Sequence, residues 1–390
     1  MVYDFDTLID RRGTDCEKWD EMASVFGRGD LLAYWVADMD FKAAPEIVQA
    51  LRDKIESGVF GYPVMTNSAR ESVANWLETR HGFSADASEI RFSPGIITSL
   101  SIAVQEFTEP GDGVVIQTPV YPQFFSIIRK NGRVVVENPL IETEDGYEMD
   151  FDNLIEVLTP NVKAMIFCSP HNPVGRVWRR EELTRLAEIC AKRGIVILCD
   201  EIHHDVVYSG SKHIPLQLAV PESAPTSLIF MAPSKTFNLA GLCASAWLSK
   251  DKQIAKRMEK ALQSVHCANI NMMGHAALEA AYRNGAQWLD SLVAYLQGNV
   301  DFAEKFFRER MPKVKMTRPE GTFLIWLDFR DYGLDGKELQ NALVQKAFVA
   351  LNPGVDYGKD YGAFARMNIG CPRAALNEGL SRIERAFASL

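Results

Sequence analysis

The chain has 390 residues, 47% hydrophobic and 24% charged, so it can bury a large core and divide into two domains. Its formal net charge of -9, from 51 acidic and 42 basic residues, disfavours nucleic acid or an anionic membrane surface as the main partner. No apolar export segment opens the chain and no window approaches a membrane span, so we expect no membrane partner and a cytoplasmic location.

The N-terminal part begins with a polar, acidic arm, and an aromatic and acidic segment at 34–41 is expected to be extended or a loop. Residues 45–57 predict a helix, because Pro45 stands in the first turn, where its missing N–H costs nothing. Residues 60–63 predict a turn, and residues 67–80 carry helical spacing.

A short strand through Phe92 leads by way of Gly95 to an apolar helix over 96–107. Free N–H groups and the helix dipole converge at such a junction, which would hold a phosphate without a basic side chain. A plain glycine turn explains the same residues, so both interpretations stay open at this point.

From Gly113 onward, strands and helices alternate. Continuous apolar runs at 164–168, 195–199 and 228–231 are typical of parallel strands covered by helices on both faces. Other expected strands are 114–117, 133–137, 244–248, 321–329 and 363–369, and other expected helices are 122–130, 152–158, 180–192, 252–264, 274–283, 288–310, 336–346 and 376–389. The pattern predicts an α/β fold: a large α/β domain at 45–284 with a mostly parallel sheet, and a smaller α+β domain at 285–390 joined by the arm at 1–44.

Functional groups gather at the carboxyl ends of strands in such a sheet, and several unusual residues fall there. Lys235 follows the apolar strand at 227–231, where a desolvated amine suits Schiff-base chemistry, although a strand-end lysine that extends to water would look the same. Asp200 ends another apolar run, where its carboxylate needs a cationic partner or caps the next helix.

Three further candidates are open to plainer explanations. Asn172 lies just beyond an apolar strand, in a stretch that a turn would also explain. Tyr121 offers a flat aromatic face at another strand end or packs in the core. Arg366 stands in an otherwise apolar strand, where a guanidinium suits bidentate capture of a carboxylate or forms a salt bridge.

A metal site is not expected. The seven cysteines are scattered, odd in number and without a C-x-x-C pair, which fits reduced thiols. His203 and His204 are adjacent, so their side chains would point apart on a strand or helix, and no second ligand cluster follows them.

The order of these motifs resembles that of the class I/II aminotransferases, the fold-type I enzymes that use pyridoxal 5'-phosphate (PLP). The resemblance covers nearly the whole chain and rests on Pro94-Gly95, Pro119-Val120-Tyr121, Asn172-Pro173-x-Gly175, Asp200-Glu201-x-His203, Ser234-Lys235-x-Phe237-Asn238 and Arg366-x-Asn368. Several motifs in this order are far more specific than any one of them.

The resemblance implies PLP as cofactor, with Lys235, Tyr121 and Asp200 as catalytic residues. Lys235 would bind PLP covalently, Asp200 would pair with the pyridine nitrogen, and Tyr121 would stack on the ring. Asn172 and His203 would lie near the ring hydroxyl, and the phosphate would be held by Gly95, Ile96, Ile97 and Ser234. The resemblance also implies a homodimer with shared active sites, in which Tyr62 reaches the phosphate of the neighbouring subunit. The amino-acid substrate would contact Arg366 and Ala37.

Two positions depart from the family's pattern. Family members often have a serine three residues before the lysine and a basic residue eight after it, both on the phosphate, whereas this chain has Ala232 and Cys243. We therefore expect backbone N–H groups and the helix that begins near Ile96 to carry more of the phosphate binding, and cofactor affinity to be lower.

Within the superfamily, the chain resembles the cystathionine β-lyase, or carbon-sulfur lyase, branch. The residues that carry this are Trp35-Val36-Ala37-Asp38-Met39-Asp40-Phe41, Gly58-Val59-Phe60-Gly61-Tyr62, Asp200-Glu201-Ile202-His203 and Pro319-Glu320-Gly321-Thr322-Phe323. The branch implies α,β-elimination from L-cystathionine or related cysteine S-conjugates to thiol, pyruvate and ammonia. An aminotransferase, which begins with the same steps, and a PLP-binding regulatory protein that acts through protein contacts remain alternatives, as does the choice of substrate.

Overall fold

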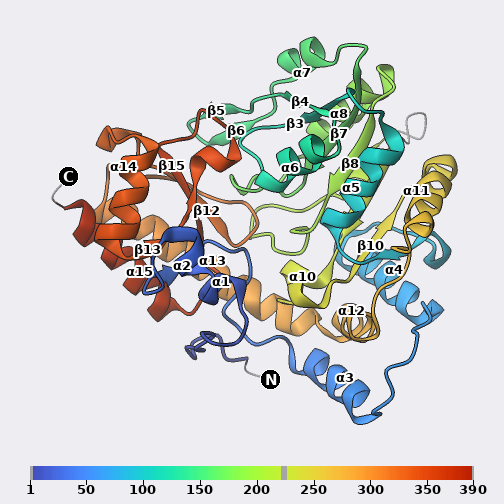
Figure 1. The fold of residues 1–390 in the computed structure, drawn as a ribbon, viewed down its shortest axis with the longest axis horizontal. Helices are drawn as coiled ribbons and strands as arrows, with labels where there is room; N and C mark the ends of the chain where they lie inside the picture. Colours follow the sequence, from blue (N-terminus) through green and yellow to red (C-terminus); the bar gives the residue numbers. More distant parts are fainter. Residues whose placement is uncertain (1–2, 221–225, 389–390) are drawn as a thin grey trace.

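A seven-stranded sheet forms the centre of residues 45–284 in the computed structural model, which describes residues 3–220 and 226–388 (Figure 1). Its strands are β2 (Arg91–Ser93), β3 (Gly113–Ile116), β4 (Val134–Glu137), β7 (Val162–Cys168), β8 (Val196–Asp200), β9 (Ser227–Met231) and β10 (Ser245–Leu248). They lie in the order β2-β10-β9-β8-β7-β3-β4; β10 pairs antiparallel with both β2 and β9, and the other pairs are parallel. The predicted α/β fold with a mostly parallel sheet is confirmed.

Helices cover both faces of this sheet, because alternate residues of a buried strand point to opposite sides. The core that contains Val114 and Ile166 includes α5 (Ile96–Phe107), α6 (Pro122–Lys130) and α11 (Lys252–Ser264). The core that contains Val115 and Phe167 includes α4 (Asn67–His81), α7 (Phe151–Val157), α8 (Arg180–Lys192), α9 (Leu216–Ala219) and α12 (Met272–Asn284). Figure 1 shows α5 and α6 in front of the sheet, with α3 (Pro45–Glu56) at the lower edge.

The C-terminal third builds a four-stranded antiparallel sheet in the order β11-β12-β15-β14. Its elements are α13 (Ala286–Arg310), β11 (Lys315–Thr317), β12 (Leu324–Asp328), α14 (Gly336–Asn341), the π-helical η4 (Ala342–Ala347), β14 (Asn352–Pro353), β15 (Phe364–Asn368) and α15 (Arg373–Phe387). Within the described ranges, no helix has the length and apolar character needed to cross a membrane.

The N-terminal arm lies against this C-terminal region, as Figure 1 shows for its dark blue helices. Strand β1 (Leu32–Ala33) pairs in parallel with β13 (Val349–Ala350). We therefore keep the division into 1–44, 45–284 and 285–390 as a proposal, in which the arm belongs with the smaller domain.

The structure differs from the predictions in several short elements. The arm contains two helices that the sequence did not reveal, α1 (Glu17–Asp20) and α2 (Met22–Phe26), and a hairpin of β5 (Ile141–Thr143) and β6 (Gly146–Glu148) precedes α7. Residues 58–66 have no regular structure, so the turn predicted at 60–63 is wrong. Single-turn helices are η1 (Ala87–Glu89), η2 (Ala240–Leu242), η3 (Arg330–Tyr332) and η5 (Gly354–Tyr357). Position 389 of the last predicted helix lies outside the described residues.

Candidate active site

Two adjoining cavities lie at the carboxyl ends of the central strands. The inner cavity, about 120 Å³, is lined by Ala37, Ile96, Ile97, Tyr121, Cys168, Asn172, Asp200, Ile202, His203 and Lys235. The outer cavity, about 770 Å³, shares Ala37, Tyr121 and Lys235 with it and also contains Arg366. The structure thus brings together most of the residues that the sequence placed at strand ends.

Lys235 lies in the four-residue helix α10 (Pro233–Thr236), directly after the fully buried strand β9. Its side chain is half-buried, and its Nζ donates a hydrogen bond to the carbonyl oxygen of Ala37 at 2.6 Å. Desolvation lowers the pKa of the Lys235 amine to about 8, from an ordinary value of 10.5, while the nearby Asp38 carboxylate opposes this shift. About a tenth of the amine is therefore neutral and nucleophilic at pH 7, far more than for a lysine of ordinary pKa.

The lowered pKa predicts how Lys235 reacts in cofactor-free protein. Below about pH 8 most of the amine is protonated and unreactive, so its acetylation rate should rise with pH and level off about one pH unit above the pKa of about 8. The measurement is mass spectrometry of the Lys235 peptide after brief exposure to acetic anhydride. A reference peptide with an ordinary lysine, pKa about 10.4, should still gain reactivity at that pH. Identical pH profiles for the two amines would contradict the lowered pKa.

Asp200 is the last residue of β8 and is only 4% exposed. Desolvation raises the pKa of its carboxyl to about 7, although its Oδ1 accepts the Ile202 N–H at 3.0 Å. In the described part of the chain, no cationic side chain forms an ion pair with Asp200. A cation placed beside this carboxylate would hold it in the ionised form.

Arg366 reaches the site from the smaller sheet, in β15, and is 3% exposed. Its guanidinium donates to the Oδ1 of Asn172 at 3.3 Å, to the carbonyl of Trp35 and to the Oδ1 of Asn352. Its Nε is buried, and no described residue accepts a hydrogen bond from it. The contact to Asn172 joins the two sheets across the site.

His203 and Tyr121 complete the inner cavity. His203 is buried, and its Nδ1 has no hydrogen-bond partner among the described residues. Burial, together with the charges of Lys235 and Arg366, lowers the pKa of His203, so the ring is neutral. Tyr121 precedes α6, and burial raises the pKa of its phenol, which therefore stays protonated.

The N-terminus of α5 forms one wall of the inner cavity. Gly95 has a φ of 122°, a conformation that favours glycine, and no side chain caps the helix, whose first residues Ile96 and Ile97 line the cavity. The hydroxyl of Ser245, in β10, accepts the Gly95 N–H at 3.1 Å and so holds this junction in place. Free N–H groups at the start of a helix attract an anion.

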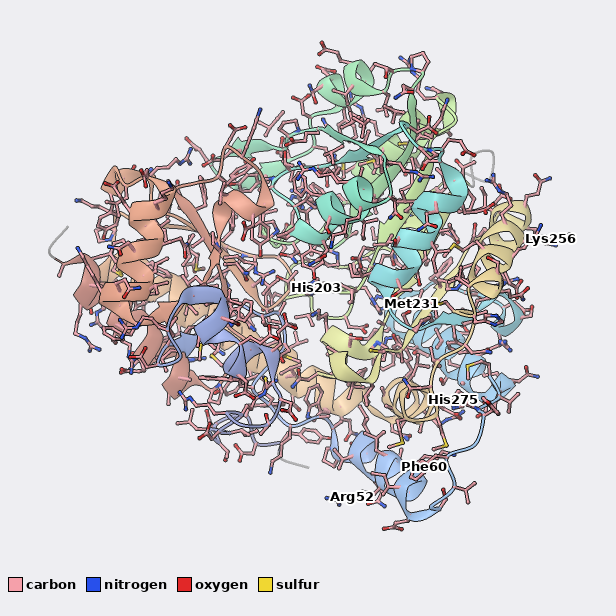
Figure 2. All side chains as sticks on the ribbon, in the orientation of Figure 1. Arg52, Phe60, His203, Met231, Lys256 and His275 are labelled. Carbon is pink, nitrogen blue, oxygen red and sulfur yellow. The ribbon has the colours of Figure 1, made fainter. Side chains whose placement is uncertain are left out.

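Three predicted phosphate contacts do not line either cavity as far as the described residues show. Gly95 directly precedes α5, whose first residues Ile96 and Ile97 do line the inner cavity. Ser234 stands beside Lys235 in α10 but lines neither cavity. Tyr62 is fully exposed in the segment 58–66. Figure 2 shows the neighbouring Phe60 at the outer edge of the molecule, away from His203 near its centre.

Sequence reasoning missed how the segment 35–41 is held over the site. The side-chain amide of Asn238 donates to the carbonyls of Met39 and Phe41, at 2.7 and 2.8 Å, and its oxygen accepts the Met39 N–H. From β15, Asn368 donates to the carbonyls of Val36 and Asp38, at 2.7 and 2.6 Å. Asn238 has a φ of 59°. The available signal in the sequence was that two motifs, Ser234-Lys235-x-Phe237-Asn238 and Arg366-x-Asn368, each end in an asparagine.

A second missed feature is a buried polar cluster behind Lys235, here called the Asp205 network. The Asp205 carboxylate accepts from the indole of Trp76 at 2.9 Å and from the hydroxyl of Thr236 at 2.8 Å, and its oxygens lie 2.9 and 3.1 Å from the Nε2 atoms of His81 and His204. His81, His204 and Asp205 have the spacing of a metal site, but the Asp205 oxygens already lie within ion-pair distance of both histidines. We interpret the cluster as structural.

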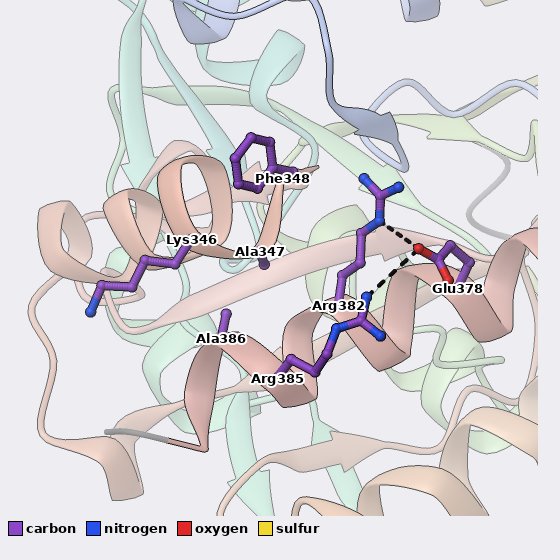
Figure 3. A pocket seen from close by; sticks show the side chains of 7 residues that line it. All are labelled: Lys346, Ala347, Phe348, Glu378, Arg382, Arg385 and Ala386. Carbon is purple, nitrogen blue, oxygen red and sulfur yellow. Dashed lines mark hydrogen bonds and ion pairs between the residues drawn. The ribbon is translucent and has the colours of Figure 1, made fainter.

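Figure 3 shows a third, shallow cavity of about 610 Å³ between η4 and α15. Its Glu378 is paired with Arg382 at 2.7 Å and with Arg385 at 3.7 Å. It shares no residue with the inner or outer cavity, so it does not belong to the candidate active site.

Comparison with known proteins agrees with this geometry. The chain is 43% identical to cystathionine beta-lyase PatB of Bacillus subtilis, over 98% of this chain and 100% of that protein. Its structure matches cystalysin from Treponema denticola, which contains a PLP cofactor, with a TM-score of 0.96 and 34% identity over 100% of both chains. It also matches the PLP-bound C-S lyase from Staphylococcus hominis, with a TM-score of 0.93 and 31% identity over 99% of this chain and 98% of that one.

The family described as aminotransferase class I and II has a model that matches residues 36–383, which include every residue that lines the inner cavity. Since this match covers most of the 390 residues, the chain belongs to the aminotransferase class I and II family.

Proposed function

We propose that the protein is a PLP-dependent carbon-sulfur β-lyase that cleaves L-cystathionine or a related cysteine S-conjugate. The observation that carries the proposal is the inner cavity, which combines the Lys235 amine of lowered pKa with the Asp200 carboxylate that lacks a cation. Similarity over the full chain to a cystathionine β-lyase and to C-S lyases supports this reaction among those of the family.

The residues present fit PLP. A protonated pyridine nitrogen would supply the cation that Asp200 lacks, and the unpaired Nδ1 of His203 lies in the same cavity as a donor or acceptor for the ring substituents. The start of α5 at Ile96 and Ile97 offers N–H groups to a phosphate, while Cys243 is exposed and, unlike a basic residue, cannot supply a positive charge to assist them. Tyr121 would lie against the ring face.

The chain's own groups then account for elimination. Arg366 would bind the α-carboxylate of the substrate, and the neutral Lys235 amine would take the Cα proton. When bound, PLP supplies an electron-withdrawing ring that stabilises negative charge at Cα. The C–S bond at Cβ then breaks, the thiolate leaves, and water converts the remaining three-carbon fragment to pyruvate and ammonia.

One assay separates this reaction from transamination, which shares its first proton transfer. The protein is incubated with L-cystathionine in the absence of any 2-oxo acid, and pyruvate and free thiol are followed. We expect many equivalents of both products per subunit. If product forms only after a 2-oxo acid acceptor is added, the protein is an aminotransferase.

We further propose a homodimer in which Tyr62 completes the partner's site. The segment 58–66 exposes Val59, Phe60, Tyr62 and Val64, each by more than 65% of its surface, which is unusual for clustered apolar side chains in a monomer. Figure 2 shows Phe60 at the edge of the molecule, away from the protein's own His203, which supports a role of this segment at a neighbouring subunit.

Shared sites predict that two inactive variants restore each other. Lys235→Ala and Tyr62→Ala each damage every site of their own dimers, but a mixed dimer places both changes in one site and leaves the other intact. After equal mixing, unfolding and refolding, we expect about a quarter of wild-type activity, because half the dimers carry one intact site of two. Activity no higher than the mean of the separate variants would argue against shared sites.

A further inference from the structure

The outer cavity is where the side chain of a bound amino acid would extend, and the inference here rests on the proposed function. Arg366 and Lys235 line its inner end, where they would hold the α-carboxylate and the reacting carbon. The unpaired, buried Nε of Arg366 is a donor that a carboxylate ligand would satisfy. The leaving group of a thioether substrate would then extend toward Glu17 in α1 and Asp356 in η5, which line the same cavity.

The outer cavity has an excess of uncompensated carboxylates. Its one cation besides Lys235 and Arg366 is Arg11, which is occupied by Asp38 at 2.6 Å and Asp40 at 2.8 Å. The remaining charged lining residues are Asp15, Glu17 and Asp356. Within the described ranges, none of these three forms an ion pair or accepts a side-chain hydrogen bond from a cation.

Two of these carboxylates, Glu17 and Asp356, are solvent-accessible residues on the wall of the cavity. Desolvation lowers the pKa of Lys235 and raises that of Tyr121, and the Glu17 carboxylate makes a small opposing contribution at Lys235 and a small additional one at Tyr121, so Glu17 lies within electrostatic range of both. Asp356 is partly desolvated, which raises the pKa of its carboxyl, and it precedes Tyr357, whose ring lies 5.4 Å from the Arg366 guanidinium carbon. A cation brought by a ligand would stabilise the ionised form of each carboxylate.

We propose that Glu17 and Asp356 recognise an ammonium group at the far end of the substrate, so that the enzyme prefers cysteine S-conjugates whose leaving thiol carries an amine. L-Cystathionine belongs to this class, because its homocysteine half carries an α-ammonium. A leaving group that carries only a carboxylate is disfavoured, since it would meet like charge without a free cation in the outer cavity.

The test compares two substrates of equal heavy-atom number. S-(2-aminoethyl)-L-cysteine ends in an ammonium, and S-propyl-L-cysteine ends in a methyl group. The two thiols leave with different intrinsic ease, so the kcat/KM ratio of the pair is measured for the wild-type holoenzyme and then for Glu17→Gln/Asp356→Asn. The change in this ratio isolates the contribution of the two carboxylates.

We expect the double variant to lower the ammonium-to-methyl ratio about 10-fold, the range of one charge-assisted contact in a partly exposed site. Its kcat/KM for S-propyl-L-cysteine should stay within about twofold of wild type. The matched control is Glu21→Gln/Asp360→Asn, which removes the same charge from nearby exposed positions outside the cavity. It should leave the ratio unchanged.

A measurement of binding keeps this test independent of the lyase reaction. L-Lysine and L-2-aminoheptanoate are the carbon analogues of ammonium and methyl substrates, and neither can expel a thiolate. Calorimetry should show that the preference for L-lysine also falls about 10-fold in the double variant. Absence of pyruvate from every conjugate would refute the proposed function alone. An unchanged preference in the double variant, or an equal loss in the control, would overturn the ammonium site.

Discussion

Replacing Lys235 with alanine should lower kcat for L-cystathionine by about 10⁴-fold or more. Two contributions vanish together: the covalent attachment of the cofactor and the base that takes the Cα proton, of which the second alone is worth about 10²–10⁴. The change also removes the hydrogen bond to the Ala37 carbonyl, so that segment 35–41 loses one of its contacts to α10. The measurement is pyruvate release at saturating substrate with excess PLP.

The control for this variant is Lys252→Ala, which removes an exposed lysine at the start of α11. It should retain full activity, and both variants should melt cooperatively. A Lys235→Ala protein that keeps more than about a tenth of wild-type kcat would require another base and contradict the assigned role.

Asp205→Asn should destabilise the folded protein by about 3–5 kcal/mol, the range for breaking a buried ion pair. The carboxylate serves Trp76, Thr236 and two histidines, and an amide of the same shape presents one donor face to groups that already donate. Desolvation opposes protonation of His204, but the charge and hydrogen bond of Asp205 are chief among the contacts that outweigh it and raise the pKa of this ring, so the change removes the counter-charge that a protonated His204 would face. Urea unfolding of the holoprotein measures the loss.

A surface ion pair on α4, the helix that carries Trp76 and His81 of the Asp205 network, provides the comparison. Arg80 of α4 pairs with Asp290 at 2.6 Å, but the Asp290 side chain is 61% exposed. Water screens such a pair, so Asp290→Asn should cost less than about 1 kcal/mol. Equal losses for Asp205→Asn and Asp290→Asn would mean that the Asp205 network does not support the fold as described.

The sequence predicted those parts of the fold whose signals are local and long. The helices α5, α6, α8 and α11 begin and end within a residue of their expected bounds, because apolar periodicity and end signals extend over several turns. By contrast, α1 and α2 have four and five residues, too few for a period to emerge. The wrong turn at 60–63 has the same origin, since Gly61 and Pro63 allow a turn without requiring one.

The candidate site was predictable where a residue follows a strand. Lys235, Asp200, Asn172 and Tyr121 all line one cavity, as parallel strands require. The Asp205 network was not predictable, because His81 and Asp205 stand 124 residues apart and either could have been a surface group. The roles of the individual site residues, with the partner subunit that Tyr62 is proposed to reach, remain predictions that variants test.

The most direct test of the central claim locates the cofactor on the chain. Purified protein supplied with PLP is reduced with borohydride, digested, and analysed by mass spectrometry for pyridoxyl-modified peptides. The account predicts a yellow protein whose reduced form carries pyridoxyl on the peptide that contains Lys235, at about one equivalent per subunit. Protein that stays colourless with excess PLP, or pyridoxyl on a different lysine, would contradict it.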